Sequence, residues 1–125
     1  MISDTRVSHT SIARATWEPF LVGEKQIGEV HWLCQRQDAQ GLLVAGLWRH
    51  RPEEHPDGMP YRVAGSETFQ VLEGSCELTA ADGDVMSLRA GDSVAFSDGF
   101  EARWQTTEPF MKFFVVTGPP ADPKG

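Results

Sequence analysis

Short stretches in which apolar and polar residues alternate occupy most of the chain from residue 29 onward. Alternation with a period of two is typical of a strand that buries one face. The pattern predicts strands at residues 29–34, 41–50, 67–72, 75–80, 85–88, 93–96, 101–105 and 110–116. No segment repeats its apolar residues at helical spacing, so the pattern favours an all-β domain.

Glycine and proline separate the expected strands. Asp82-Gly83 is a strong hairpin signal, Glu73-Gly74 is read as another turn, and the prolines between residues 51 and 60 predict a loop. Short strands at intervals of roughly 8–12 residues are typical of a sandwich or a barrel. The pattern alone leaves an immunoglobulin-like sandwich and a jelly roll equally open.

The length of 125 residues suits one domain. Residues 1–16 are polar and predict an arm that is flexible or exchanged between subunits. Residues 17–117 hold the expected strands and form one barrel domain. Residues 118–125 are rich in proline and glycine and predict a frayed tail.

The charge balance excludes some partners. Eleven Lys and Arg stand against 18 Asp and Glu, which gives a net charge of −7 with no basic run. Nucleic acids and anionic membranes both demand a basic surface, so neither is expected as a partner. No secretory signal is visible and no apolar run approaches the ~20 residues of a membrane span, so we expect a cytoplasmic protein.

The segment from Glu67 to Gly99 resembles the paired motifs of the cupin superfamily. Glu67 and Gly74 have the spacing that ends the first motif, while Gly91 and Gly99, eight apart, fit the second. Residues 98–116 are similar to the ureidoglycine aminohydrolase-like branch of single-domain cupins. The resemblance implies a cupin-type double-stranded β-helix, which is a jelly-roll barrel. It also implies a homodimer paired through strands, because exposed sheet edges need covering.

The chain departs from the family pattern at the metal ligands, where Glu67 alone remains. Other residues stand at the remaining motif positions: Tyr61 and Val63 (or Pro60 and Arg62, with the longer spacing) at the first two histidines, Ala102 at the third, Ser97 at the proline and Thr106 at the asparagine. Transition metals in such sites usually need several imidazoles beside a carboxylate. No cofactor is therefore expected.

The same register predicts what faces the barrel interior. If Glu67 points inward, every second residue of its strand should follow it. The expected ligand-binding residues are Trp48, Tyr61, Val63, Glu67, Phe69, Ala102 and Trp104. A mostly apolar pocket with a carboxylate, a phenol and an indole N–H suits a small polar organic molecule.

Glu67 is the candidate catalytic residue. A carboxylate in an apolar barrel either has a raised pKa or pairs with a cation, and Arg62 and Arg103 are the nearest basic residues in sequence. A carboxyl group with a raised pKa can act as a general acid or base. The competing interpretation is a structural Glu67 hydrogen-bonded to Tyr61 or Trp104.

Three functions stay open from the sequence. The first is a small-molecule-binding cupin, with or without catalysis on an unknown substrate. The second is a metal-dependent enzyme of the ureidoglycine aminohydrolase-like kind, in which His50 or His55 joins Glu67 and holds a divalent transition metal; otherwise these histidines belong to a solvated loop at the rim. The third is a non-catalytic ligand sensor or interaction module whose barrel is filled by side chains.

Overall fold

The computed structural model of the protein describes residues 4–120. It contains two short 3₁₀ turns, η1 (Ile12–Arg14) and η2 (Pro52–Glu54), and the strands β1 (Glu18–Val22), β2 (Lys25–Asp38), β3 (Gly41–His50), β4 (Met59–Arg62), β5 (Ser66–Thr79), β6 (Val85–Arg89), β7 (Ser93–Phe96) and β8 (Glu101–Gly118). The prediction of an all-β domain is confirmed.

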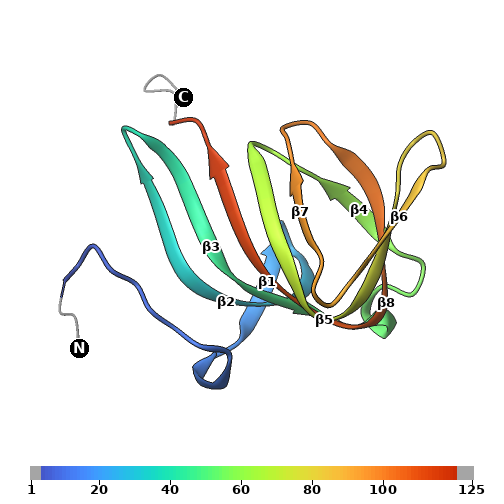
Figure 1. The fold of residues 1–125 in the computed structure, drawn as a ribbon, viewed down its shortest axis with the longest axis horizontal. Coiled ribbons are helices and arrows are strands. Elements are labelled where there is room, and N and C mark those ends of the chain that lie inside the picture. The colour runs from blue at the N-terminus through green and yellow to red at the C-terminus, as the bar shows by residue number, and fades with distance from the viewer. Residues whose placement is uncertain (1–3, 121–125) are drawn as a thin grey trace.

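All strand pairs are antiparallel, and the sheet order is β1-β2-β3-β8-β5-β6, with β4 paired to β8 and β7 paired to β5. Figure 1 shows the sheet folded over, with β2 and β3 on one side and β4, β6 and β7 on the other. The long strands β5 and β8 belong to both sides. One end of β8 pairs with β3 and its other end pairs with β4. This is the expected jelly-roll barrel.

The turn predicted at Glu73-Gly74 is wrong. Residues 66–79 form one continuous strand, and the ladder between β5 and β8 shifts register around Glu73 and Ser75. Gly74 has φ of +75°, so it bends the strand as a β-bulge without ending it. The two strands expected at 101–105 and 110–116 are likewise one strand, β8.

The core lies between the two sides of the folded sheet and is rich in aromatic residues. Burial alternates along β5, where Glu67, Phe69 and Val71 are buried and the residues between them are exposed. The inward orientation expected for these three residues is confirmed. The buried cluster also includes Val30, Trp48, Leu78, Leu88, Phe96, Trp104, Phe110 and Phe114.

The N-terminal segment is anchored by His31 on β2. His31 Nε2 lies 2.7 Å from Thr10 Oγ1, and its Nδ1 lies 3.0 Å from the carbonyl oxygen of Thr16. Residues 1–3 of the predicted arm and residues 121–125 of the predicted tail lie outside the described residues. In residues 4–120, no helix is long and apolar enough to cross a membrane.

Candidate ligand-binding site

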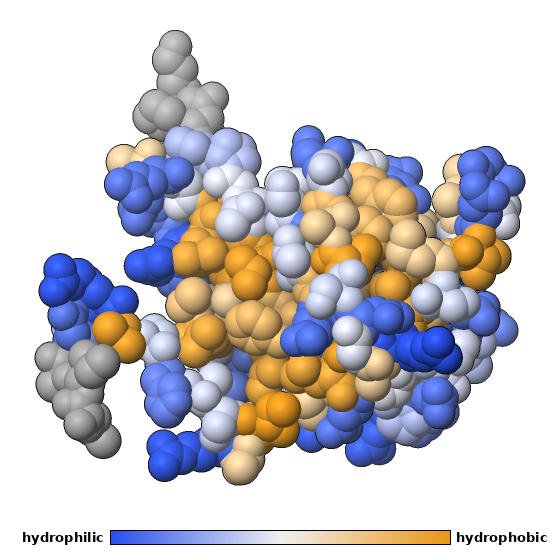
Figure 2. Space-filling model, in the orientation of Figure 1, coloured by the Kyte–Doolittle hydropathy of each residue, from blue (hydrophilic) through white to orange (hydrophobic). Residues whose placement is uncertain are grey.

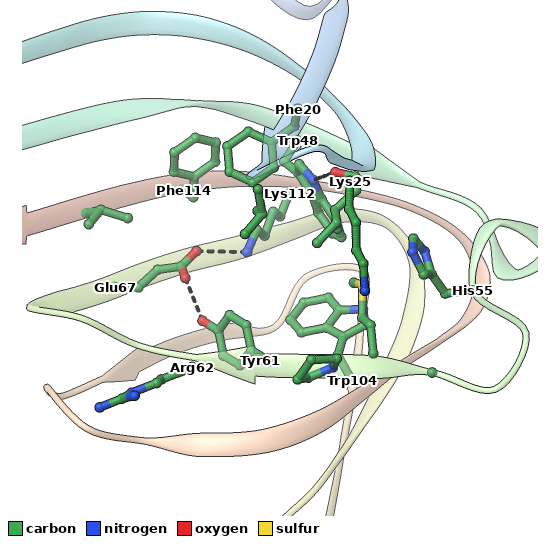
Figure 3. A pocket seen from close by; sticks show the side chains of 16 residues that line it. Phe20, Lys25, Trp48, His55, Tyr61, Arg62, Glu67, Trp104, Lys112 and Phe114 are labelled. Atoms are coloured by element: carbon green, nitrogen blue, oxygen red, sulfur yellow. Dashed lines mark hydrogen bonds and ion pairs between the residues drawn. The ribbon is translucent and has the colours of Figure 1, made fainter.

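The barrel contains a cavity of about 740 Å³ that is partly open to solvent. Figure 3 shows its lining side chains, which come from β1, β2, β3, β4, β5, β8 and the loop after η2. Most of the wall is apolar: Phe20, Val22, Ile27, Trp48, Met59, Pro60, Trp104, Phe114 and Val116. In the space-filling view, apolar side chains gather across the middle of one face of the molecule with hydrophilic side chains around them (Figure 2).

Glu67 carries the polar group of this cavity. The Tyr61 hydroxyl donates to Glu67 Oε1 over 2.5 Å, and the Lys112 ammonium donates to Oε2 over 2.7 Å (Figure 3). Glu67 is 9% exposed and Lys112 is 6% exposed. A carboxylate is stable at this depth because a cation and a hydroxyl donor replace the water it has lost.

Tyr61 acts as a hydrogen-bond donor in this arrangement. Burial is the main cause that raises the pKa of its hydroxyl far above the usual value, and the neighbouring Glu67 carboxylate adds to the shift. Both effects disfavour the phenolate. Tyr61 therefore keeps its proton and holds Glu67 Oε1 in place.

The cation beside Glu67 is Lys112 and not Arg62 or Arg103, the basic residues nearest to it in sequence. Arg62 Nε lies 3.4 Å from a Glu101 oxygen, and Arg103 donates to the carbonyl oxygen of Asp57. Lys112 was missed, although alternation along β8 puts it on the same inward face as Phe110 and Phe114. The decisive fact is the pairing of β5 with β8, which places Lys112 opposite Val71 on the neighbouring strand.

Aromatic rings surround the Lys112 ammonium. Its nitrogen lies 4.3 Å from the ring centre of Phe69, 5.0 Å from Trp104 and 5.1 Å from Trp48, with Tyr61 and Phe114 slightly farther. Ring faces attract a cation within about 6 Å. The rings and Glu67 together offset the cost of burying the ammonium.

The residues expected to contact a ligand divide into two groups. Trp48, Tyr61, Glu67 and Trp104 line the cavity. The other three, Val63, Phe69 and Ala102, do not line it; Val63 and Phe69 are core residues and Ala102 packs against the core.

His50 is not in a solvated loop, as one interpretation expected, and it does not reach Glu67. It is 2% exposed, its Nδ1 lies 2.7 Å from Thr106 Oγ1, and its Nε2 lies 2.9 Å from His55 Nδ1. Burial lowers the pKa of His50. Thr106 Oγ1 also accepts a hydrogen bond from Trp104 Nε1, so this network fixes one wall of the cavity. His55 lines the cavity itself.

A metal ion does not fit these residues. Within residues 4–120, no group of three His, Cys, Asp or Glu side chains could hold a metal. Both oxygens of Glu67 already have partners, and one partner is an ammonium that would repel a metal cation. The cation beside Glu67 is supplied by the chain.

The comparisons with known proteins agree with the fold. The EutQ-like cupin domain family matches residues 44–114, and the chain belongs to the cupin superfamily through this family. No curated protein matches the chain.

Solved structures give the same fold at low identity. A DUF861 family protein from Thermotoga maritima is 28% identical, with a TM-score of 0.51 over 56% of this chain and 75% of that one. An RmlC-like cupin protein from Ralstonia eutropha JMP134 is 17% identical, with a TM-score of 0.64 over 86% and 66%. The Fe(II) form of HppE is 14% identical, with a TM-score of 0.63 over 90% and 62%.

Proposed function

We propose that this cupin binds a small organic molecule in its barrel without a metal ion. The observation that carries the proposal is the cavity of about 740 Å³, whose mostly apolar wall holds a hydrogen-bonded cluster of Tyr61, Glu67 and Lys112. A cavity of this size with a few fixed polar groups is typical of small-molecule sites.

Two of the alternatives from the sequence have less support. A barrel filled by side chains would leave no such cavity. A site like that of an iron enzyme would need ligands in place of Tyr61, Val63 and Ala102, so likeness to Fe(II) HppE supports only the fold. Kinship with the ureidoglycine aminohydrolase-like branch stays a prediction.

Tryptophan resonances test the proposal directly. Trp48 and Trp104 line the cavity, whereas Trp17 does not and serves as the internal control. A fragment screen against protein labelled with ¹⁵N-tryptophan should give hits that shift the indole N–H signals of Trp48 and Trp104 and leave that of Trp17 unchanged. Hits that move only Trp17, or no hits, would overturn the proposal.

Elemental analysis completes the test. Protein purified without chelator should contain far less than one equivalent of manganese, iron, nickel or zinc per chain. One equivalent, lost in Glu67→Gln, would establish the rearranged metal site and contradict the metal-free cavity.

A second candidate is proton transfer by Glu67, which lines the cavity and is held in place by Tyr61 and Lys112. General acid–base catalysis needs such a group within hydrogen-bond reach of the ligand. With an identified ligand, Glu67→Gln should then end turnover and preserve binding. Unchanged turnover in that variant would leave Glu67 with a binding role alone.

A further inference from the structure

The charges that face the cavity oppose the charge of the whole molecule. The protein carries a net charge of −7. Among the described residues that line the cavity, however, Glu67 is the only acid, while Lys25, Arg62 and Lys112 are basic. A cavity with this excess attracts an anion in spite of the acidic surface around it.

The excess positive charge lies at the mouth and not in the interior. Deep in the barrel, the Lys112 ammonium and the Glu67 carboxylate cancel one another. At the mouth of the cavity, Arg62 forms an ion pair with Glu101, and 3.4 Å separate its Nε from Glu101 Oε1. Lys25 is exposed on the hairpin formed by β1 and β2, and it has no ion-pair partner within residues 4–120. In Figure 3, no dashed line joins the Lys25 side chain to another residue, whereas Lys112 is joined to Glu67.

The interior calls for a different ligand group. Lys112 has three N–H donors, of which one serves Glu67 and no other acceptor on the described chain receives one. An anion placed there would also approach the Glu67 carboxylate, and like charges repel. A neutral oxygen or an aromatic face meets no such repulsion. The anionic group of a ligand is therefore best placed at Lys25.

We propose that the ligand is a small organic carboxylate with an aromatic or branched aliphatic body. The body lies against Trp48, Trp104 and Phe114, and the carboxylate pairs with Lys25 at the mouth. This inference rests on the proposed function, because it names the class of ligand that the same cavity takes.

Three probes with one body and different charges test the inference. They are 3-phenylpropanoate, its neutral amide and the cationic 3-phenylpropylamine, each titrated by calorimetry at low salt. An exposed ion pair is worth up to about 1 kcal/mol, so the carboxylate should bind about 2- to 5-fold more tightly than the amide. Added salt should reduce this preference.

Variants assign the preference to one side chain. Lys25→Gln should abolish the preference for the carboxylate over the amide. Lys25→Glu should make 3-phenylpropylamine the tightest-binding of the three probes. Arg36→Gln changes the net charge equally on an exposed part of β2 outside the cavity, and it should keep the preference.

The outcomes separate this inference from the proposed function. If the carboxylate and the amide bind equally well, the ligand class is wrong while the cavity remains a binding site. If Arg36→Gln weakens the preference as much as Lys25→Gln, the effect is one of net charge and the inference is wrong. If none of the three probes binds while the fragment screen gives hits at Trp48 and Trp104, the ligand class is wrong and the cavity remains a binding site. If neither the probes nor the fragments bind, both proposals are overturned.

Discussion

At the scale of single residues, the buried carboxylate Glu67 has a cation of the chain itself as its partner. Lys112 contacts the one motif ligand that remains, Glu67, at 2.7 Å among five aromatic rings. Removing one partner of a buried pair costs more than removing both, because the remaining charge is left without compensation.

A double-mutant cycle tests this pair. Lys112→Met and Glu67→Gln should each lower the free energy of unfolding, Lys112→Met by about 3 kcal/mol or more. The double variant should lose less than the sum of the two, with a coupling of about 1–3 kcal/mol. Urea denaturation measures all four proteins. Simple additivity would show that the two groups do not stabilise one another.

At the scale of elements, the site depends on how β5 and β8 are bent together. β5 provides Glu67 and β8 provides Lys112, and the ladder between them shifts register near Gly74. A Cβ at Gly74 would overlap the carbonyl oxygen of Pro109 on β8, whereas Gly83 has nothing within 4 Å. Both glycines have positive φ, so they differ mainly in the close approach of a backbone.

This difference gives a matched pair of variants. Gly83→Ala should lower the free energy of unfolding by about 1–2 kcal/mol, which is the penalty for placing a residue with a Cβ in a left-handed conformation. Gly74→Ala should lower the free energy of unfolding by clearly more than Gly83→Ala does, since β5 and β8 must also separate. It should in addition shift the Trp104 indole signal. Thermal unfolding and the tryptophan spectrum measure the two effects. Equal losses in the two variants would show that close packing at Gly74 has no role.

At the scale of the whole molecule, the two ends of the sheet order are exposed. The sheet order ends at β1 and β6, which expose Leu21 and Val22, and Val85 and Met86. The homodimer expected from the sequence stays a prediction.

His50 joins β3 to β8 through Thr106 and to the loop after η2 through His55, so its protonation state bears on global stability.

The stability of the protein should fall in mild acid. Burial lowers the pKa of His50 in the folded protein from its ordinary value of 6.5, with a smaller lowering by His55 against opposing effects of Glu54 and Glu53. At a pH between the two pKa values, His50 therefore binds a proton in the unfolded chain and not in the folded chain. The free energy of unfolding should therefore be intact above about pH 6.5 and decrease below it, by at most about 1.4 kcal/mol per pH unit.

Urea denaturation between pH 8 and pH 5 measures this slope. In His50→Gln the slope should be smaller, even if the variant is less stable throughout. His9→Gln, at an exposed position, is the control and should keep the slope of the original protein. Identical slopes in all three proteins would exclude His50 as the titrating group.

The sequence by itself determined the class of fold and part of the site. Alternating apolar residues predicted the strands, and the spacing of Glu67, Gly74, Gly91 and Gly99 indicated the cupin family, to which the chain belongs. The inward faces of Glu67, Phe69 and Trp104 were also predictable. The strands and their inward faces follow from a period of two, which is local and can be read along one strand, whereas the family was indicated by resemblance to its motifs.

Only the tertiary structure decided which residues meet in the barrel. The choice of Lys112 over Arg62 and Arg103 depends on the pairing of two strands 45 residues apart at the contact. The burial of His50 depends on Thr106, 56 residues away. Such contacts are set by register, bulges and the folding of the sheet over itself. A charge is buried where a partner reaches it, and the position of that partner is a property of the whole fold.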